Sequence, residues 1–486
     1  MLWDRERGRP LALAPSPRRS RTPEAVALVL FAVFVLRPGF RDRPRSQGDS
    51  REYFLTAESL LNHGTPFVEP QDLASLDALA RRHRVETGLG WPSSLHVTSP
   101  DGLVQGVHFW AYPLATLPLK WLLRATGENE LKALQITNLI FLVSCLVHAL
   151  FFSKWPLLAA RVFAAGLALS PLLPFVLWPH PEVFSASLTA FALVFRHDGR
   201  RIPAVLCAAV AAAQNAPLVL IAAWLLASFL PEAPRGDRLL LVAAFLPALV
   251  PPALAWATLG TPHVLLLAGA ADPANLSARR ALELLIDPDL GLLAHLPLTL
   301  PVAAFALLKR PERALVEDAV LLVAMAYACT VVTNWNSGTS GPSRYGIWLL
   351  PLAVDALARS AVRPSPVFPR AAALAVAVQA AILVGRGGPQ ALDDHLRHSP
   401  LAEVLLDRWP SLYDPGFEVF AERTLHEEQA LRGLVVFRAE GRCRKALLQK
   451  RHRAELRERC GPWRVGPDFR ELVAAKGKDA WTYVDY

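Results

Sequence analysis

The chain has 486 residues, of which 53% are hydrophobic and only 19% are charged, and its mean hydropathy is +0.29. A soluble domain is about a quarter charged and does not need many long apolar runs, so these values exclude an ordinary soluble protein and indicate a multi-pass membrane protein. The net charge of +9 does not indicate a nucleic-acid partner, because the basic residues are spread through short loops between apolar segments.

The chain begins with a basic segment, residues 1–23, that precedes the first apolar run at residues 24–39. Arg18, Arg19 and Arg21 lie just before this run, a pattern that also occurs in signal peptides. No small-residue cleavage site follows the run, so we interpret it as an uncleaved first span with a cytoplasmic N-terminus.

Further runs approach the length, on the order of 20 mostly apolar residues, that a membrane-crossing helix needs. They are centred on residues 131–152, 157–177, 183–195, 202–214, 217–230, 239–258, 291–308, 314–333, 346–358 and 369–386. The sequence therefore predicts an all-α polytopic membrane protein with about eleven transmembrane helices over residues 24–386.

The charge distribution predicts the orientation of these spans. If they alternate, every connection on the cytoplasmic side is short and basic, as the positive-inside rule requires. The basic residues in question are Lys154 and Arg161, Arg196, Arg200 and Arg201, Arg235 and Arg238, Lys309, Arg310 and Arg313, and Arg359, Arg363 and Arg370. The external side then receives a large first loop, three shorter polar segments and the tail, at residues 40–107, 178–182, 259–290, 334–345 and 387–486.

The first external loop has two segments with helical periodicity. Residues 50–64 (SREYFLTAESLLNHG) place Tyr53, Ala57 and Leu60 on one face, and residues 69–84 also separate apolar from charged positions. We expect both to be amphipathic helices lying in the membrane interface.

Acidic residues at the start of this loop are candidates for acid–base chemistry. Asp49 directly precedes the first of these helices, and Glu52 follows three residues later, which is also the spacing of a capping box. Both interpretations of Asp49 stay open, since a base at a helix cap is well held. Glu52 and Glu58 are expected to be solvated or interfacial charges.

Two external segments combine aromatic residues with ionisable ones. His180 and Glu182 lie in a compact corner (WPHPE), and ionisable residues at membrane depth are candidates for function, although an interfacial turn would also explain them. Arg344 and Tyr345 stand at the head of a later span, where arginine suits bidentate phosphate recognition and where both residues are also ordinary anchors.

The loop at residues 259–290 contains two further motifs. Arg279 and Arg280 break the positive-inside pattern, so they are candidates for a phosphate or lipid-headgroup contact. Asp287-Pro-Asp289 matches the DxD pattern that many glycosyltransferases use for a metal, but it is also a common turn sequence. We do not assign it as a metal site.

The tail, residues 387–486, is expected to form a small external α+β unit. Residues 431–438 (LRGLVVFR) predict a strand, and the charged run before Cys460 predicts a helix. Cys443 and Cys460 could form a disulfide if the tail lies in an oxidising compartment, and would be free thiols if the span count is off by one.

At this point the sequence resembles a known family, the GT-C superfamily of polytopic glycosyltransferases, which includes protein O-mannosyltransferases and aminoarabinose transferases. The resemblance rests on the first span, the opening Gly48-Asp49-x-x-x-Tyr53, the large external loop and the re-entry His108-Phe-Trp-Ala-Tyr-Pro. It covers residues 24–125 best, and the segment from Asn334 to Tyr345 is similar to a late external loop of bacterial members.

The resemblance implies a function and assigns roles. It implies a bacterial-type inner-membrane enzyme that moves a sugar, with inversion, from a polyprenyl-phosphate donor to an acceptor on the external face. It implies that Asp49 is the base that deprotonates the acceptor hydroxyl. It also favours a phosphate contact for Arg344 and Tyr345. On the chemical grounds given above, Arg279 and Arg280 are further phosphate candidates, His180 could contact the phosphate, and Glu182 could orient His180 or bind an acceptor sugar. A divalent metal could assist, but no convincing motif identifies one.

The sequence lacks the motifs that are typical of several other enzyme classes. There is no GxxxxGK[ST] loop, no HExxH pair, no GxSxG elbow and no CxxC. A transporter or flippase for a lipid-linked substrate is the alternative function, but it should show repeated halves, which we do not find. A non-catalytic envelope scaffold is the third possibility.

Overall fold

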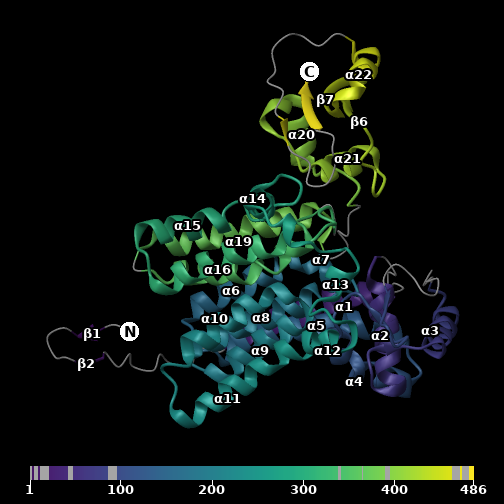
Figure 1. Cartoon of the computed structure of the whole chain (residues 1–486). Helices are drawn as coiled ribbons and strands as arrows, with labels where there is room; N and C mark the ends of the chain where they lie inside the picture. Colours follow the sequence, from purple (N-terminus) through teal and green to yellow (C-terminus); the bar gives the residue numbers. More distant parts are fainter. Residues whose placement is uncertain are drawn as a thin grey trace.

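The structure is a computed structural model that describes residues 21–41, 48–85, 96–337, 341–363, 365–388, 395–461 and 481–486, with two-residue strands at 3–4, 9–10 and 471–472. The part it describes is mainly helical, with small antiparallel sheets. A helical body over residues 22–385 carries a C-terminal unit over residues 400–485 at one end (Figure 1).

The helices of the body are α1 (Thr22–Arg41), α2 (Ser50–His63), α3 (Pro70–His83), α4 (Ala111–Thr126), α5 (Ala133–Val147), α6 (Leu157–Ala168), α7 (Leu172–Val176), α8 (Glu182–Asp198), α9 (Arg201–Gln214), α10 (Val219–Phe229), α11 (Arg235–Phe245), α12 (Val250–Leu259), α13 (Val264–Leu267), α14 (Ala278–Ile286), α15 (Thr299–Lys309), α16 (Arg313–Cys329), α17 (Arg344–Ile347), α18 (Leu350–Ala361) and α19 (Val367–Gly385). Its strands are β3 (Phe67–Val68), β4 (His96–Thr98) and β5 (Val104–Gly106), and β1 (Trp3–Asp4) pairs with β2 (Arg9–Pro10) near the N-terminus.

Every predicted apolar run contains a helix, but few of these helices are long. In the described part, three are long and apolar enough to cross a membrane, namely Glu130–Phe152, Arg235–Leu259 and Val367–Gly385. Shorter apolar helices of 10–17 residues occupy Thr22–Val35, Leu157–Ala168, Arg201–Gln214, Ala216–Phe229 and Thr299–Lys309. The prediction of about eleven transmembrane helices is therefore not confirmed.

Small side chains let the central helices approach one another closely. Helices α8 and α9 pack against each other along buried alanines such as Ala186 and Ala208. Gly166 of α6 lies against α18, where an added Cβ would be 2.9 Å from Val354 Cγ1. This packing fixes α18 and, just before it, α17.

Helix α2 is buried on all sides, which differs from the interfacial helix expected from its periodicity. Its side chains from Glu52 to Leu60 are buried, including both acidic residues. Glu52 is 1% exposed and Glu58 is fully buried, so the prediction that they are solvated or interfacial charges is wrong. Glu58 is instead neutralised by Lys120 and Arg124 of α4. Burial of a charge requires such a partner, and here the partners attach α4 to α2.

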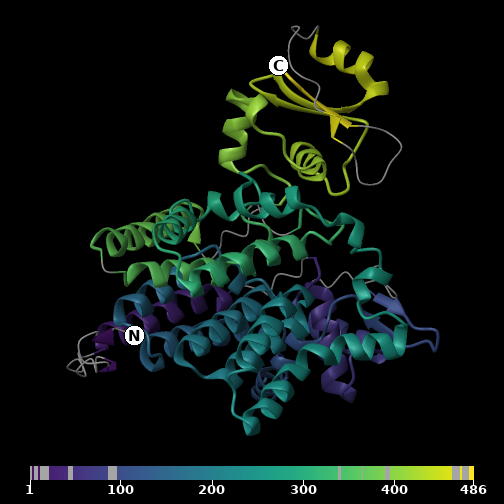
Figure 2. The ribbon, with the colours of Figure 1, turned by 60° about the vertical axis from the view of Figure 1, so that its left-hand side comes forward.

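The C-terminal unit is a four-stranded antiparallel sheet with helices on both faces (Figure 2). Its elements are α20 (Pro400–Arg408), α21 (Phe417–Leu425), β6 (Leu434–Ala439), β7 (Arg442–Gln449), α22 (Arg453–Cys460), β8 (Glu471–Leu472) and β9 (Trp481–Asp485), and the strand order is β6-β7-β9-β8. Val435 and Leu447 pack towards α20 and α21, whereas Leu434 and Leu448 pack towards Leu456 of α22. The alternation follows from the two-residue period of a strand.

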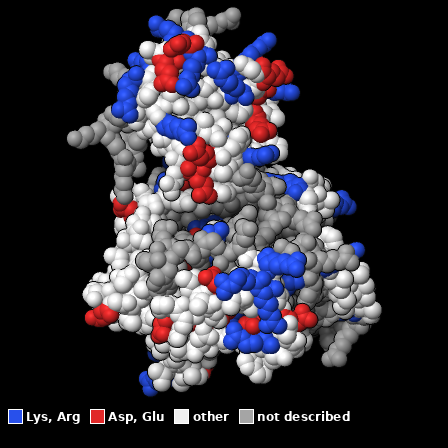
Figure 3. Space-filling view, turned by 90° about the vertical axis from the view of Figure 1, so that its right-hand side faces the viewer, with Lys and Arg blue, Asp and Glu red and all other residues white. Residues whose placement is uncertain are grey.

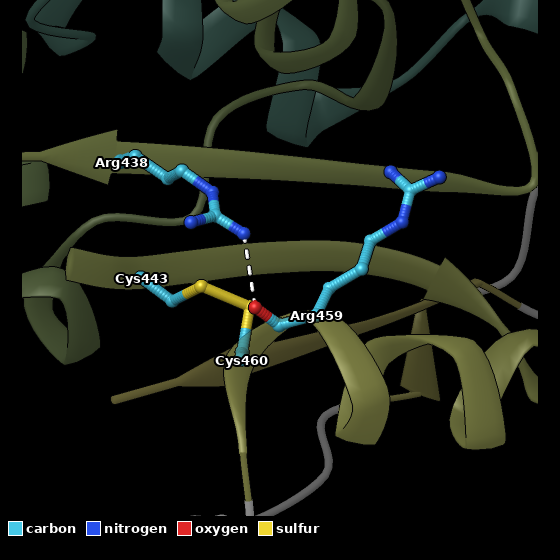
Figure 4. Close-up of a disulfide and its surroundings, with 4 residues drawn as sticks. All are labelled: Arg438, Cys443, Arg459 and Cys460. Atoms are coloured by element: carbon cyan, nitrogen blue, oxygen red, sulfur yellow. Dashed lines mark hydrogen bonds between the residues drawn. A yellow bond between two sulfur atoms is a disulfide. The ribbon is translucent and has the colours of Figure 1, made fainter. Parts of the chain in front are cut away.

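A disulfide joins Cys443 of β7 to Cys460 at the end of α22, with 5.8 Å between the Cα atoms (Figure 4). The guanidinium of Arg438 on β6 donates to the carbonyl of Arg459 at 3.0 Å, beside the disulfide. Together these links attach α22 to the sheet.

The Asp287-Pro-Asp289 turn connects the helical body to the C-terminal unit. Asp289 is buried and accepts from His398 at 2.8 Å and from Arg423 at 3.3 Å. The hydroxyl of Tyr413 donates to both carboxylates, at 3.1 Å each. The turn therefore anchors the segments around α20 and α21, which explains both carboxylates without a metal.

Candidate functional site

A cavity of about 380 Å³ lies in the helical body, beside the start of α2 and residues 107–109. Segments far apart in sequence form its walls: the start of α2, residues 107–109, the corner before α8, the end of α9 with the residues after it, and residues 263–273, 329–334 and 344–348. Of the residues predicted for the site, Asp49, Glu182, Arg344 and Tyr345 all line it.

The central contact of the cavity is an ion pair between Asp49 and Arg344, which are 295 residues apart in sequence. Only about a sixth of each side chain is exposed, at 16% and 15% respectively. Burial by itself would raise the pKa of Asp49, but the charges of Arg344, His108 and His180 outweigh it and hold this pKa well below its ordinary value. Asp49 is therefore ionised at every physiological pH while Arg344 is beside it.

The side chain of Asp49 does not cap α2, so the capping-box interpretation is wrong. Its backbone carbonyl accepts from the amide of Tyr53 at 3.2 Å, while the carboxylate faces Arg344. Glu52, the other member of the expected box, is hydrogen-bonded elsewhere. The cap position thus holds the backbone of Asp49 and leaves its carboxylate for the cavity.

Glu52 holds His108, a site residue to which the sequence analysis assigned no role. The carboxylate accepts from the backbone amide of His108 at 2.7 Å and from its Nδ1 at 2.8 Å, and His108 Nε2 lies 3.5 Å from Asp49 Oδ2. Burial lowers the pKa of His108, but Glu52 and Asp49 outweigh this effect, so the pKa is raised above its ordinary value. Gly106 makes room for Glu52, because an added Cβ would lie 2.8 Å from Glu52 Cδ.

His180 lies beside the same cluster but does not line the cavity. Its ring stacks on Trp178 at 3.7 Å between centroids and meets the ring of Tyr53 edge-on at 5.6 Å. Asn138 of α5 donates to the carbonyls of Trp178 and His180, at 3.1 and 2.9 Å. The corner is therefore a rigid, buried turn that presents Glu182 at the start of α8.

The loop that leads to Arg344 is held by the C-terminal unit. Glu418 of α21 accepts from the backbone amides of Trp335 and Asn336, at 2.9 and 3.0 Å. The hydroxyl of Tyr345 donates to the carbonyl of Asn334 at 3.4 Å, and its ring stacks near Trp335 at 6.2 Å. One wall of the cavity thus depends on a unit that is more than seventy residues away in sequence.

Arg279 and Arg280 do not line the cavity, in contrast to their predicted role. Arg279 pairs with Glu283 and donates to the carbonyl of Asp414, so it contributes to the junction with the C-terminal unit. Arg280 donates to the carbonyls of Thr330 and Val332. The exception to the charge rule is explained by these contacts to the body and the tail.

The described residues include no group of three or more His, Cys, Asp or Glu side chains placed to hold a metal ion. The ionisable side chains that line the cavity include Asp49, His108, Glu182 and Arg344. Arginine can bind an anionic oxygen through two donors, and an adjacent carboxylate can accept a proton.

The surface beside α3 is basic. Helix α3 lies at the right-hand edge of Figure 1 and faces the viewer in Figure 3, where Lys and Arg side chains gather below the C-terminal unit. Its last turn carries the exposed residues Arg81 and Arg82. A basic surface of this kind attracts anionic headgroups.

No family model matches the chain, and no curated protein matches it. Among solved structures, two crystal structures of ArnT from Cupriavidus metallidurans are similar, one in the apo state and one bound to undecaprenyl phosphate. Each aligns with 14% sequence identity and a TM-score of 0.46, over 76% of this chain and 65% of its own length. At this TM-score the likeness carries no conclusion about the activity of this chain.

Proposed function

We propose that the protein is a membrane glycosyltransferase that moves a sugar from a polyprenyl-phosphate donor to an acceptor hydroxyl. The observation that supports this most directly is the ion pair between Asp49 and Arg344 inside a cavity with mostly apolar walls. The pair brings a proton acceptor and a phosphate-binding cation to one point, and the reaction needs both.

The reaction would begin with a change of partner at Arg344. When the donor phosphate binds to Arg344, it displaces the carboxylate of Asp49 and removes the main charge that holds the pKa of Asp49 down. Asp49 then becomes a better base and accepts the proton of the acceptor hydroxyl. The acceptor oxygen forms a bond to the anomeric carbon, the bond from that carbon to the phosphate oxygen breaks, and polyprenyl phosphate leaves as an anion on Arg344. A single displacement of this kind inverts the anomeric centre.

The lipid tail would lie outside the cavity, against apolar surface at its edge. A volume of about 380 Å³ suits a sugar and a phosphate but not a polyprenyl chain. At the edge, Leu266 lines the cavity and is 39% exposed, and Leu267 beside it is 53% exposed. These leucines of α13 are suited to contact with a lipid, which would enter sideways from the membrane.

The test uses the full-length protein, purified and reconstituted into vesicles. Undecaprenyl phosphate carrying a labelled hexose is added, and the release of undecaprenyl phosphate and of glycosylated product is followed by mass spectrometry. Removing one general base or one phosphate-binding cation should lower the rate by about 100-fold or more, so Asp49→Asn and Arg344→Ala should both be nearly inactive.

Matched controls separate this effect from a general loss of charge. Asp237→Asn and Arg235→Ala, both at exposed positions of α11, should keep the activity of the unmodified protein. Full activity of Asp49→Asn would refute the role of Asp49. Movement of the labelled lipid across the membrane without any new product would instead support a flippase.

A further inference from the structure

Among the residues that the structure describes, two buried polar atoms at the cavity, Gln214 Nε2 and Glu182 Oε2, have no hydrogen-bond partner, and both of these residues line the cavity. His180 Nδ1 lies 4.0 Å from Glu182 Oε2, which is beyond hydrogen-bond distance. Gln214 is 3% exposed and Glu182 is 2% exposed. A buried donor or acceptor that lacks a hydrogen bond destabilises the fold, so two such atoms facing one cavity indicate a polar ligand.

Local contacts orient the amide of Gln214. Its Oε1 accepts from the backbone amide of Tyr112 at 2.7 Å, which leaves the Nε2 group as a free donor. The hydroxyl of Tyr112 donates to the carbonyl of Leu134 at 2.8 Å and so holds Tyr112 in turn. The direction of the amide is therefore determined by the fold.

The end of α9 and the start of α8 are joined directly beside these two residues. Asn215, which directly follows Gln214, donates through its Nδ2 to the Oγ of Ser185 at 2.7 Å. Ser185 lies one helical turn after Glu182. A neutral donor and a carboxylate acceptor consequently face the same part of the cavity from adjacent helices. His263, whose pKa is lowered to about 4 by burial and by His108, adds an uncharged ring to the lining.

From this pairing we infer that Gln214 and Glu182 form a subsite for the hydroxyl groups of a sugar. A hydroxyl group is both donor and acceptor, so adjacent sugar hydroxyls can accept from the Gln214 amide and donate to the Glu182 carboxylate. Burial raises the pKa of Glu182 to about 7, so near neutral pH this group is partly ionised and partly a neutral acid. A phosphate is better compensated at Arg344, which carries a permanent positive charge, than beside Glu182. The role of this subsite in glycosyl transfer rests on the proposed function, whereas its binding of a sugar does not.

Two variants remove one hydrogen-bonding atom each and preserve shape. Gln214→Glu keeps the oxygen that accepts from Tyr112 and replaces the donor, and Glu182→Gln keeps the length of the side chain and removes its charge. The exposed Asp237→Asn serves as the matched control. Thermal unfolding of each variant checks that the fold is retained.

The experiment measures binding rather than turnover, on the full chain in lipid nanodiscs. The probes are undecaprenyl phosphate, undecaprenyl-phosphate-linked glucose, and methyl α-glucoside added with saturating undecaprenyl phosphate. Losing a hydrogen bond in a site built for hydroxyls should weaken binding by about 10- to 100-fold. We expect both variants to show this loss for a glucose-bearing probe and to bind sugar-free undecaprenyl phosphate normally.

The two sugar probes identify the source of the hydroxyls. Loss confined to the lipid-linked glucose assigns the subsite to the donor sugar, and loss confined to methyl α-glucoside assigns it to the acceptor. The inference is overturned if the unmodified protein binds neither sugar probe, or if both variants bind both of them normally. If sugar binding depends on Gln214 while no transfer occurs, the subsite stands and the proposed function fails.

Discussion

The substitution Gly106→Ala tests how the cluster of Asp49, Glu52 and His108 is held together. Gly106 ends β5, two residues before His108, and an added Cβ would lie 2.8 Å from both Cδ and Cγ of Glu52. Real Cβ atoms essentially never come so close, so either the backbone or the carboxylate must move. Glu52 is 1% exposed and is held by two hydrogen bonds from His108, at 2.7 and 2.8 Å.

The expected cost follows from these two bonds. A hydrogen bond to a charged group contributes about 1.5–3 kcal/mol, and since two bonds from one residue are not independent, their joint loss should cost about 3 kcal/mol. Without Glu52, the ring of His108 is no longer fixed 3.5 Å from Asp49. We therefore expect Gly106→Ala to lower both the midpoint of thermal unfolding and the rate of glycosyl transfer.

A control glycine makes this prediction specific. Gly236 in α11 has no atom within 4 Å of an added Cβ and no positive φ, so Gly236→Ala should stabilise its helix by about 0.5–1 kcal/mol. Both variants are compared with the unmodified protein by thermal unfolding in detergent and by transfer from a labelled lipid donor. Equal unfolding midpoints and equal activities for the two variants would refute the role given to the contact between Gly106 and Glu52.

Three further predictions follow from other contacts. The pKa of His108 in the folded state is raised above 6.5, so its charge stabilises the fold fully below about pH 6.5 and progressively less as the pH rises through the raised pKa. The difference in unfolding midpoint between the unmodified protein and His108→Gln should therefore shrink from about pH 5.5 to about pH 9. A difference that grows over this range would contradict the prediction. Glu418→Ala should lower the rate of transfer by about 10-fold, because the loop at Trp335 loses the carboxylate that holds its backbone amides. Glu418→Gln can still accept from these amides and should retain most of the activity. Equal loss in both variants would contradict a positioning role for Glu418. Removal of the disulfide in Cys443→Ser should destabilise the C-terminal unit by about 3 kcal/mol, measured as faster proteolysis of this unit. Unchanged proteolysis would show that the link is dispensable.

The sequence predicts the parts of this protein that depend on local pattern. Apolar runs locate the helices, because a helix needs a continuous apolar stretch whether it is buried in protein or in lipid. The same ambiguity explains why the number of membrane-crossing helices could not be predicted. Composition cannot distinguish a helix that crosses a membrane from a short apolar helix packed inside the body. In the tail, alternation and β-branched residues predicted a strand at 431–438, and β6 is observed at Leu434–Ala439.

The site is only partly predictable, and the reason is geometric. Asp49 and Arg344 were singled out one at a time, by position and by resemblance, but their ion pair joins residues 295 apart. It is decided by the packing of α17 against α8, α14 and α16, which brings Arg344 to Asp49. Gln214 carries no signal in the sequence at all, since it is one polar residue at the end of an alanine-rich helix.

Burial is the property that only the tertiary structure decided. Glu52 and Glu58 have the spacing of surface charges, yet both are buried because Lys120 and His108 arrive from distant segments to neutralise them. Arg279 shows the reverse case, since its unusual sidedness suggested a ligand and the C-terminal unit supplies the partner instead. A charged side chain is stable wherever a partner compensates its lost hydration, and a one-dimensional pattern does not contain the position of that partner.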